Sequence, residues 1–390
     1  MKNKPLLTIF AIVFVDLLGF GIILPLLPYI AEKYHATATQ IGLLTAAYSF
    51  FQLVASPILG KLSDRYGRKK ILMISQFGSA IGYLMLAFSN NLPLLFVSRI
   101  IDGITGGNIS IAQAYIADVT TKENRAKGMG MIGAAFGLGF IFGPAIGGFL
   151  SQFGYMYPAL FAMVVGLITV LLTHLFLPET VNIKEREHIA PTPFSLIEIK
   201  KVLIKSGIGY LIVIFLLLNT SFSLFTGIFA LWTQKKFGFG ATENGYFFAY
   251  IGILSVIAQL KVLPYLATRF KENKLLAYST FYLFLGLFFL PFVTRWEYLL
   301  FTQLFIVSGN SIANPSIQAL ASENVQKEEY GETLGFLSSA GSVGRIIGPI
   351  IGGELFDYWG INSPFFFGSL IILIVFVYLQ VRLRRKLPLL

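Results

Sequence analysis

Several ionisable residues lie within otherwise apolar stretches of this 390-residue sequence, among them Asp16, Arg99 and Asp102. Asp16 follows the apolar run 6–15, and Arg99 and Asp102 are three residues apart in the stretch that begins at Leu92. In a helix, that spacing places the Arg99 and Asp102 side chains on one face. A charged side chain at the centre of a membrane span costs at least about 2.5 kcal/mol, so such residues usually face a bundle interior or a cavity.

A carboxyl group in an apolar, intermittently wet cavity can exchange a proton within reach of physiological pH. Asp16 and Asp102 are therefore our candidate proton carriers, and Arg99 would shift their protonation equilibrium. The alternative is that the Arg99–Asp102 pair only fixes helix packing. That alternative leaves Asp16 unexplained.

The composition argues against other chemistry. The sequence has no Cys, which excludes disulfides, thiol catalysis and Cys-bound metal, and its three His residues are scattered. It contains no GxxxxGK[ST] sequence for ATP binding and no nucleophile–base set of an enzyme. We expect no catalytic residue, no metal and no cofactor, with a proton gradient as the energy source.

Apolar blocks of about 20 residues recur along the chain, each long enough to cross a hydrocarbon core of about 30 Å. Hydrophobic residues make up 55% of the sequence and charged residues only 13%, whereas soluble domains carry about 25% charged residues. We therefore predict an all-α integral membrane protein with twelve spans. The predicted spans are 6–30, 41–60, 70–88, 92–117, 128–151, 156–178, 208–232, 243–265, 275–294, 297–321, 330–355 and 364–382.

The net charge of +11 would suggest nucleic-acid binding in a soluble protein. Here, most basic residues lie in short segments on one side of the predicted spans, as the positive-inside rule requires. We therefore expect no nucleic-acid partner and place both termini in the cytoplasm.

The chain divides into two related halves. Residues 143–148 (GPAIGG) return as 348–353 (GPIIGG), an offset of 205. Six-span repeats of this kind are a transporter architecture. We predict an N-terminal six-helix bundle at 1–178, a cytoplasmic linker at 179–206 and a C-terminal six-helix bundle at 207–390.

The segment 60–70 reads GKLSDRYGRKK. It resembles the loop motif of the major facilitator superfamily, G-x-L-x-D-R-x-G-R-K-x, at every defined position, and positive-inside charge alone would not explain its glycines and aspartate. In that family the Asp, here Asp64, helps to lock the cytoplasmic side of the two halves, with an acid at the end of span four, here Asp118. Such a charge-assisted cluster can break when the halves move. The resemblance implies a conformational lock formed by Gly60, Asp64, Arg65, Gly67, Arg68, Lys69 and Asp118.

Span five reads GLGFIFGPAIGG at residues 137–148. Its glycines at intervals of four are typical of close helix packing. The segment also resembles the antiporter motif of the superfamily, which favours exporters. The residues that carry this resemblance are Gly139, Gly143, Pro144, Gly147 and Gly148.

Within the superfamily, the chain is most similar to 12-span drug:proton antiporters. The Arg in span four and the acid in span one fit that group, and 103–106 (GITG) and 114–118 (AYIAD) resemble tetracycline efflux pumps and their relatives. Membrane acids and a His that those pumps carry are replaced here by Gly82, Ser255 and Phe284. These differences weaken tetracycline as the substrate.

Further polar and aromatic groups at membrane depth are candidate contacts to a substrate, although hydrogen bonds between helices would explain them equally well. Arg345 could instead pair with Glu354. The candidates are Tyr48, Gln52, Asn108, Gln113, Asn219, Phe222, Gln259, Asn310, Asn314, Gln318 and Arg345.

The resemblance implies the major facilitator fold, two pseudo-symmetric six-helix bundles, in a monomeric multi-pass protein of the cell membrane. We expect a secondary active transporter that exports a small amphipathic compound in exchange for protons by alternating access. Its partners would be the small molecule, protons and the lipid bilayer. The alternatives are a proton-coupled or facilitated carrier of a nutrient or metabolite and a non-transporting sensor. The span-five motif counts against the first, and the cost of buried acids counts against the second.

Overall fold

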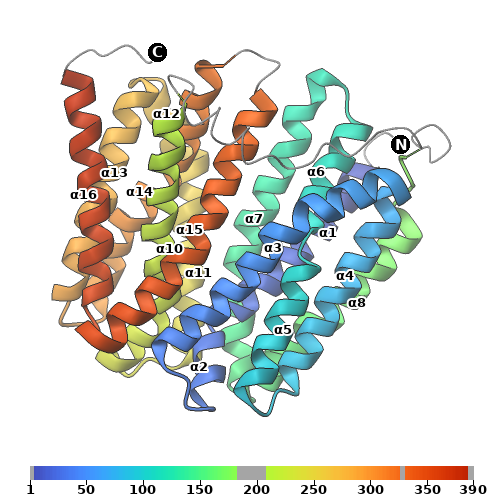
Figure 1. Cartoon of the computed structure of the whole chain (residues 1–390), viewed down its shortest axis with the longest axis horizontal. Coiled ribbons are helices and arrows are strands. Elements are labelled where there is room, and N and C mark those ends of the chain that lie inside the picture. The colour runs from blue at the N-terminus through green and yellow to red at the C-terminus, as the bar shows by residue number, and fades with distance from the viewer. Residues whose placement is uncertain (1–3, 182–207, 326–329, 385–390) are drawn as a thin grey trace. The chain divides into compact units, whose positions relative to one another are not determined.

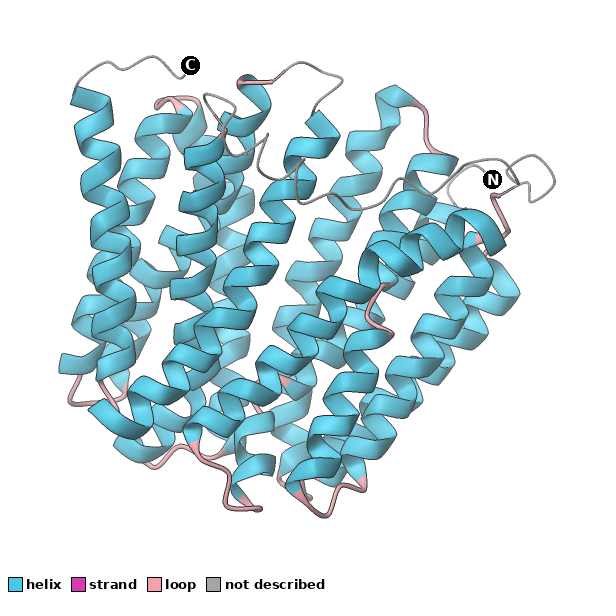
Figure 2. Ribbon diagram, in the orientation of Figure 1, coloured by secondary structure: helices cyan, strands magenta, loops and turns pink. Residues whose placement is uncertain are grey.

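The structure is a computed structural model that describes residues 4–181, 208–325 and 330–384, and every regular element in these ranges is a helix (Figures 1 and 2). The first helices are α1 (Lys4–Ile23), α2 (Leu27–Glu32), α3 (Ala38–Tyr66), α4 (Arg68–Ala87), α5 (Leu92–Ile104), α6 (Asn108–Val119), α7 (Lys122–Ser151) and α8 (Met156–Phe176). The later ones are α10 (Gly209–Phe237), α11 (Ala241–Ile257), η2 (Ala258–Val262), α12 (Leu263–Ala267), α13 (Glu272–Phe289), η3 (Leu290–Phe292), α14 (Glu297–Glu323), α15 (Tyr330–Trp359) and α16 (Ser363–Arg384).

Eleven helical stretches of the described chain are long and apolar enough to cross a membrane. The remaining long helix, α14, has 27 residues, about 40 Å at the rise of an α-helix. Its amide side chains, among them Gln303, Asn310 and Asn314, lower the hydropathy of its apolar stretch, so it is not among these eleven. With α14, the described helices account for the twelve predicted spans and confirm the all-α membrane fold.

Several predicted spans are interrupted helices. The span 6–30 is split between α1 and α2 at residues 24–26, next to prolines that lack a backbone N–H. The span 92–117 is split between α5 and α6 at Thr105–Gly107. A π-helical turn, η2, follows α11 within the span 243–265, and such turns are frequent at functional sites.

The segment 60–70 is not the loop that we predicted. Residues up to Tyr66 complete the last turns of α3, and α4 starts at Arg68, so the whole connection is Gly67. The φ angle of Gly67 is +101°, a conformation that side chains with a Cβ rarely adopt. A single glycine therefore turns the chain between two helices and holds the charged residues on their ends.

The glycines of α7 allow its backbone to approach that of α1. A methyl group at Gly139 would lie 2.8 Å from the Leu17 Cβ, and one at Gly143 would lie 2.8 Å from the Leu18 carbonyl oxygen. Gly147 packs in the same way against Ile22. These contacts match the small-residue packing that the four-residue spacing predicts.

Two more residues of this segment extend the contact. The Pro144 ring lies against Gly21 on α1, and Gly148 packs against Gly245 on α11. The glycine pattern is thus a packing surface for two different helices.

The second half repeats this packing. A methyl group at Gly348 on α15 would lie 2.5 Å from the Thr220 carbonyl oxygen on α10, and Gly352 packs against Leu224. The glycine pattern that returns at an offset of 205 residues therefore makes the same kind of helix pair in each half.

The described residues form two compact units: the first contains 4–36, 47–181 and 239–252, and the second contains 37–46, 208–238, 253–325 and 330–384. The core of the first unit includes Ile9, Ile12, Ile111, Tyr115 and Ala135, all fully buried. Residues 182–206 of the predicted linker lie outside the described residues, so the predicted boundaries of the two sequence halves stay a prediction.

Candidate functional site

The three residues predicted to handle protons lie together in the interior of the first unit. Arg99 Nη1 and Asp102 Oδ2 are 3.1 Å apart, and both side chains are only 4% exposed. Asp16 on α1 interacts electrostatically with Asp102 and accepts a hydrogen bond from Asn108 Nδ2 on α6. Asn108, a predicted substrate contact, is buried at this position. The helical spacing predicted the Arg99–Asp102 pair, but nothing local predicted that Asn108 would contact Asp16.

Two local features hold these groups in place. Gly82 on α4 lets α5 come close, because a Cβ at this position would lie 2.9 Å from the Asp102 Cβ. The break between α5 and α6 makes Asn108 the first residue of α6. Beside this break, Gln52 Nε2 on α3 donates to the Gly106 carbonyl oxygen over 3.1 Å and to Tyr48 Oη over 2.9 Å.

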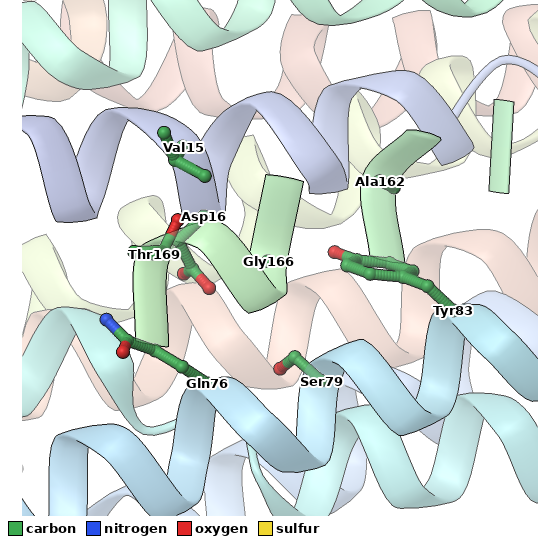
Figure 3. Close-up of a pocket in the computed structure, with 8 residues that line it drawn as sticks. All are labelled: Val15, Asp16, Gln76, Ser79, Tyr83, Ala162, Gly166 and Thr169. Atoms are coloured by element: carbon green, nitrogen blue, oxygen red, sulfur yellow. The ribbon is translucent and has the colours of Figure 1, made fainter. Parts of the chain in front are cut away.

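A cavity about the size of one water molecule adjoins Asp16 (Figure 3). Ser79 hydrogen-bonds the Asp102 carboxylate, and the Arg99 guanidinium lies 5.9 Å from the centre of the Tyr83 ring. The cavity is therefore lined by the Asp16 carboxyl group and by Ser79, the partner of the Asp102 carboxylate. Its lining residues are Val15 and Asp16 on α1, Gln76, Ser79 and Tyr83 on α4, and Ala162, Gly166 and Thr169 on α8.

The sequence contains a signal for part of this lining that our prediction did not use. Gln76, Ser79 and Tyr83 are spaced by three and four residues, so they share one face of α4. A polar face on a membrane helix indicates that this face turns toward protein or water rather than lipid. Thr169 on α8 has no such partner pattern, and only the structure assigns it to the cavity.

The charges of the buried cluster do not cancel. With both carboxyl groups ionised, Asp16, Asp102 and Arg99 together carry a net charge of −1. Because Arg99 already pairs with Asp102, the uncompensated negative charge lies on Asp16, which accepts a hydrogen bond from the neutral Asn108 amide. One proton on Asp16 makes the cluster neutral, which a membrane interior favours.

The predicted lock is centred on Arg68, the first residue of α4. Its guanidinium contacts Asp64 on α3 over 2.5 Å and Asp118 on α6 over 3.0 Å, and it donates to Ser63 Oγ over 2.8 Å. Arg68 is only 5% exposed. The structure therefore brings the two predicted acids to one arginine, which connects three helices.

Glu179, which the sequence analysis did not single out, completes this cluster. Its carboxylate accepts from the backbone N–H of Arg68 over 2.9 Å and from that of Lys69 over 3.1 Å. It thus caps the free N–H groups at the start of α4, where the helix dipole also favours an anion. A Cβ at Gly67 would collide with this carboxylate, so the glycine makes room for the cap.

The other predicted lock residues lie at the edge of the cluster. Lys69 Nζ donates to the His174 carbonyl oxygen over 2.6 Å. The Arg65 guanidinium lies 5.3 Å from the centre of the Tyr66 ring. A methyl group at Gly60 would meet no described atom within 4 Å, so close packing does not explain this glycine.

The predicted substrate contacts fall in both units, and those of the second unit include three amide side chains. In the second unit, Asn219 Nδ2 on α10 lies 3.4 Å from Asn314 Oδ1 on α14, and Asn314 donates to Asn310 Oδ1 over 3.0 Å, which makes a short amide chain. Phe222, one turn further along α10, contacts the Phe225 ring.

The remaining candidates are exposed in the structure. They include Gln113 on α6, Gln318 on α14 and Gln259, which lies within the π-helical turn. Arg345 donates to Ser342 Oγ over 2.8 Å. Within the described residues, no group of three or more His, Asp or Glu side chains is arranged to hold a metal ion.

The model of the Major Facilitator Superfamily matches residues 9–296 and 262–389. The chain belongs to this superfamily. The match confirms the predicted family and fold class and identifies the chain as a multi-pass membrane transporter.

Two relatives are similar over nearly their whole length. Tetracycline resistance protein, class H, of Pasteurella multocida is 30% identical over 91% of this chain and 90% of its own. Multidrug resistance protein 1 of Bacillus subtilis (strain 168) is 31% identical over 94% of this chain and 93% of its own. These names fit the drug antiporter group that the sequence resembles.

Solved structures show the same fold at low sequence identity. The human organic anion transporter MFSD10 (TETRAN) is 24% identical, with a TM-score of 0.73 over 97% of this chain and 99% of that one. The nucleoside transporter NupG is 15% identical, with a TM-score of 0.78 over 97% and 98% of the two chains.

Proposed function

We propose that this transporter exports a small amphipathic compound, such as a drug or a metabolite, in exchange for protons. The observation that carries the proposal is the group of Asp16 and the buried Asp102 and Arg99 inside the first unit, with its net charge of −1. Relatives named for tetracycline and multidrug resistance support export of a compound of this kind. The proposal assigns no catalytic residue, no cofactor and no enzymatic activity to the chain.

The proton would bind at Asp16. When Asp16 is ionised, Asn108 donates a hydrogen bond to it, and the neighbouring Asp102 carboxylate opposes the second negative charge. Protonation removes this repulsion. Arg99 keeps Asp102 paired in both states, so Asp16 is the group that changes its charge.

The break between α5 and α6 would connect the proton to the transported compound. Asn108 contacts Asp16 on one side of this break, and Gln52 bonds to Gly106 on the other. Gln52 also holds the hydroxyl of Tyr48, a candidate substrate contact. A change in the Asn108–Asp16 hydrogen bond would therefore be passed through three residues to the Tyr48 ring.

Movement of the helices would require the Arg68 cluster to open and close. Arg68 joins α3, α4 and α6 through two carboxylates, so separating these helices breaks charge-assisted bonds. In the second unit, the amides of Asn219, Asn310 and Asn314 would offer hydrogen bonds to the compound. We place the transporter in the cell membrane, as a monomer with both termini in the cytoplasm.

The test is proton movement in liposomes that contain the purified protein. A panel of amphipathic compounds is added under an imposed pH gradient, and a pH-sensitive dye inside the vesicles reports proton flux. We expect at least one compound to evoke proton movement that is lost in Asp16→Asn. The exposed Glu354→Gln provides a matched control that should keep full flux.

If the double variant D16N/D102N moves the compound and protons as the natural chain does, the coupling assignment is wrong. Compound uptake down its own gradient without any proton flux would indicate a facilitated carrier instead.

A further inference from the structure

The cavity beside Asp16 offers oxygen lone pairs rather than hydrogen-bond donors. The Thr169 hydroxyl uses its only hydrogen on the Val165 carbonyl oxygen, at 2.8 Å. The Ser79 hydroxyl is hydrogen-bonded to the Asp102 carboxylate, which can only accept. Both hydroxyl oxygens therefore keep free lone pairs, and the Asp16 carboxylate adds a charged oxygen at the same cavity.

Gln76 completes this set. It is 3% exposed, it lines the cavity, and its Nε2 has no hydrogen-bond partner among the described residues. Its Oε1 lies 3.0 Å from Thr173 Oγ1, which also lies 2.8 Å from the Thr169 carbonyl oxygen. The single hydrogen of this hydroxyl can be donated to only one of the two acceptors. Rotating the Gln76 amide by 180° exchanges its nitrogen and oxygen. The N–H then has a partner, because it donates to the Thr173 hydroxyl, and the carbonyl oxygen becomes free for the cavity.

The charge and the size of the cavity select the occupant. Hard cations bind oxygen ligands of the kinds present here: a carboxylate, an amide carbonyl and hydroxyls. A monovalent cation would neutralise the net charge of −1, whereas a divalent cation would leave +1 inside the membrane, at a high cost. Na⁺ is smaller than a water molecule and fits within this space, whereas K⁺ is about as large as a water molecule and would fill it completely.

We propose that this cavity binds one Na⁺ in competition with the proton. The inference rests on the proposed function for the role of Asp16, and it adds an inorganic cation that can replace the transported proton. One carboxylate among neutral oxygens differs from the three-acid clusters that bind transition metals. Sodium would then inhibit proton coupling, or would take the place of protons when the Na⁺ concentration is high.

The groups around Asp16 allow this exchange. On α5 the ionisable neighbours are Arg99 and Asp102, and on α4 the neighbour is Tyr83. The residues that α6 and α8 contribute here, Asn108 and Thr169, are not ionisable, and α7 faces α1 through glycines. The Arg99 charge is already used by Asp102, so it does not expel a second cation from Asp16.

The test measures protons released when salt is added to the purified protein in weakly buffered micelles, with a pH-sensitive dye as the readout. NaCl should release up to about one proton per protein, whereas KCl and choline chloride at equal ionic strength should release none. Asp16→Asn should abolish the release. Thr169→Val and Gln76→Leu should raise the half-saturating Na⁺ concentration at least about tenfold, as loss of a supporting group does in metal sites.

A matched control is Thr280→Val, which removes an equally buried threonine hydroxyl on α13, bonded within its helix to the Ala277 carbonyl oxygen. It should leave the Na⁺ response unchanged. Equal proton release by NaCl and KCl, no release at all, or the same Na⁺ response in T169V, Q76L and T280V would overturn the inference. The natural chain alone decides the salt comparison if a variant fails to fold. Compound-evoked proton flux in Na⁺-free liposomes tests the proposed function separately.

Discussion

The close contact of α1 with α7 predicts opposite effects for the same substitution at two positions of one helix. A methyl group at Gly143 would lie 2.8 Å from the Leu18 carbonyl oxygen, whereas one at Gly130 would meet no described atom within 4 Å. The second half offers an equivalent pair on α15: Gly348 is in close contact with α10, and a methyl group at Gly335 would meet no described atom within 4 Å. Four Gly→Ala variants therefore form two matched pairs.

The size of the effect follows from two terms. Alanine stabilises a helix by about 1 kcal/mol relative to glycine, and this term is present at all four positions. Extra atoms in a tightly packed contact cost about 1–3 kcal/mol, because the opposing backbone cannot move aside. Within each pair the propensity term cancels. Gly143→Ala should therefore be about 1–3 kcal/mol less stable than Gly130→Ala, and Gly348→Ala should be less stable than Gly335→Ala by a similar amount.

Unfolding in mixed micelles with increasing sodium dodecyl sulfate, followed by the fluorescence of the three Trp residues, measures these free energies of unfolding. Dye methods that label cysteine do not apply, because the chain has none. If Gly143→Ala is as stable as Gly130→Ala, then the α1 and α7 backbones are not in contact. A difference in the first pair without one in the second would show that the two halves do not share this packing.

Three further predictions use the same unfolding measurement. Gly67→Ala should lower the free energy of unfolding by about 2–4 kcal/mol, because it strains a positive φ and displaces the Glu179 cap. The loss should be smaller in a chain in which Glu179 has already been changed to Ala. Asp357→Ala should cost about 1 kcal/mol, because its carboxylate accepts from two backbone N–H groups at the start of α3, and an equal loss in the exposed Glu354→Ala would contradict this. Arg99→Leu should lower the free energy of unfolding by about 3–5 kcal/mol, because it leaves the buried Asp102 carboxylate unpaired. Gln303→Leu should be neutral or stabilising, because both polar atoms of its buried amide lack a partner among the described residues. Equal losses in these last two variants would contradict the burial of the charge pair.

Features with a local pattern could be predicted from the sequence. Apolar blocks of span length fix the number of helices, because the bilayer sets their length. The three-residue spacing of Arg99 and Asp102 places them in contact on one helix, and the spacing of the α7 glycines shows that this helix packs closely. The motif at 60–70 identified Asp64 and the acid at the end of α6 as partners of one basic cluster.

Features that depend on packing between distant segments could not be predicted. Glu179 caps α4 from 111 residues away in the sequence, and Asn108 reaches Asp16 across 92 residues. The sequence around Glu179 and around Asn108 does not predict which residue each of them contacts. The predicted loop at 60–70 was wrong for a related reason: several polar residues suggested a loop, but Arg68 is buried between two acids, so the helices continue into the charged segment.

The repeated packing gives an independent view of the buried charges. Gly82 faces Asp102 as Gly286 faces Ile306 in the second half, an offset of 204 residues. At this offset, Thr302 repeats the bond that Ser98 makes to the carbonyl oxygen three residues before it.

At the same offset, Arg99 corresponds to Gln303. Gly143 contacts the Leu18 carbonyl oxygen as Gly348 contacts the Thr220 carbonyl oxygen, so Leu18 corresponds to Thr220 and Asp16 to Leu218. Leu218, Gln303 and Ile306 are fully buried, and none can carry a charge. The second half therefore fills these three positions with buried neutral side chains in similar packing, so the framework itself does not require ionisable groups there. Because the second half maintains the packing with neutral side chains, packing alone does not account for Asp16, Arg99 and Asp102 in the first.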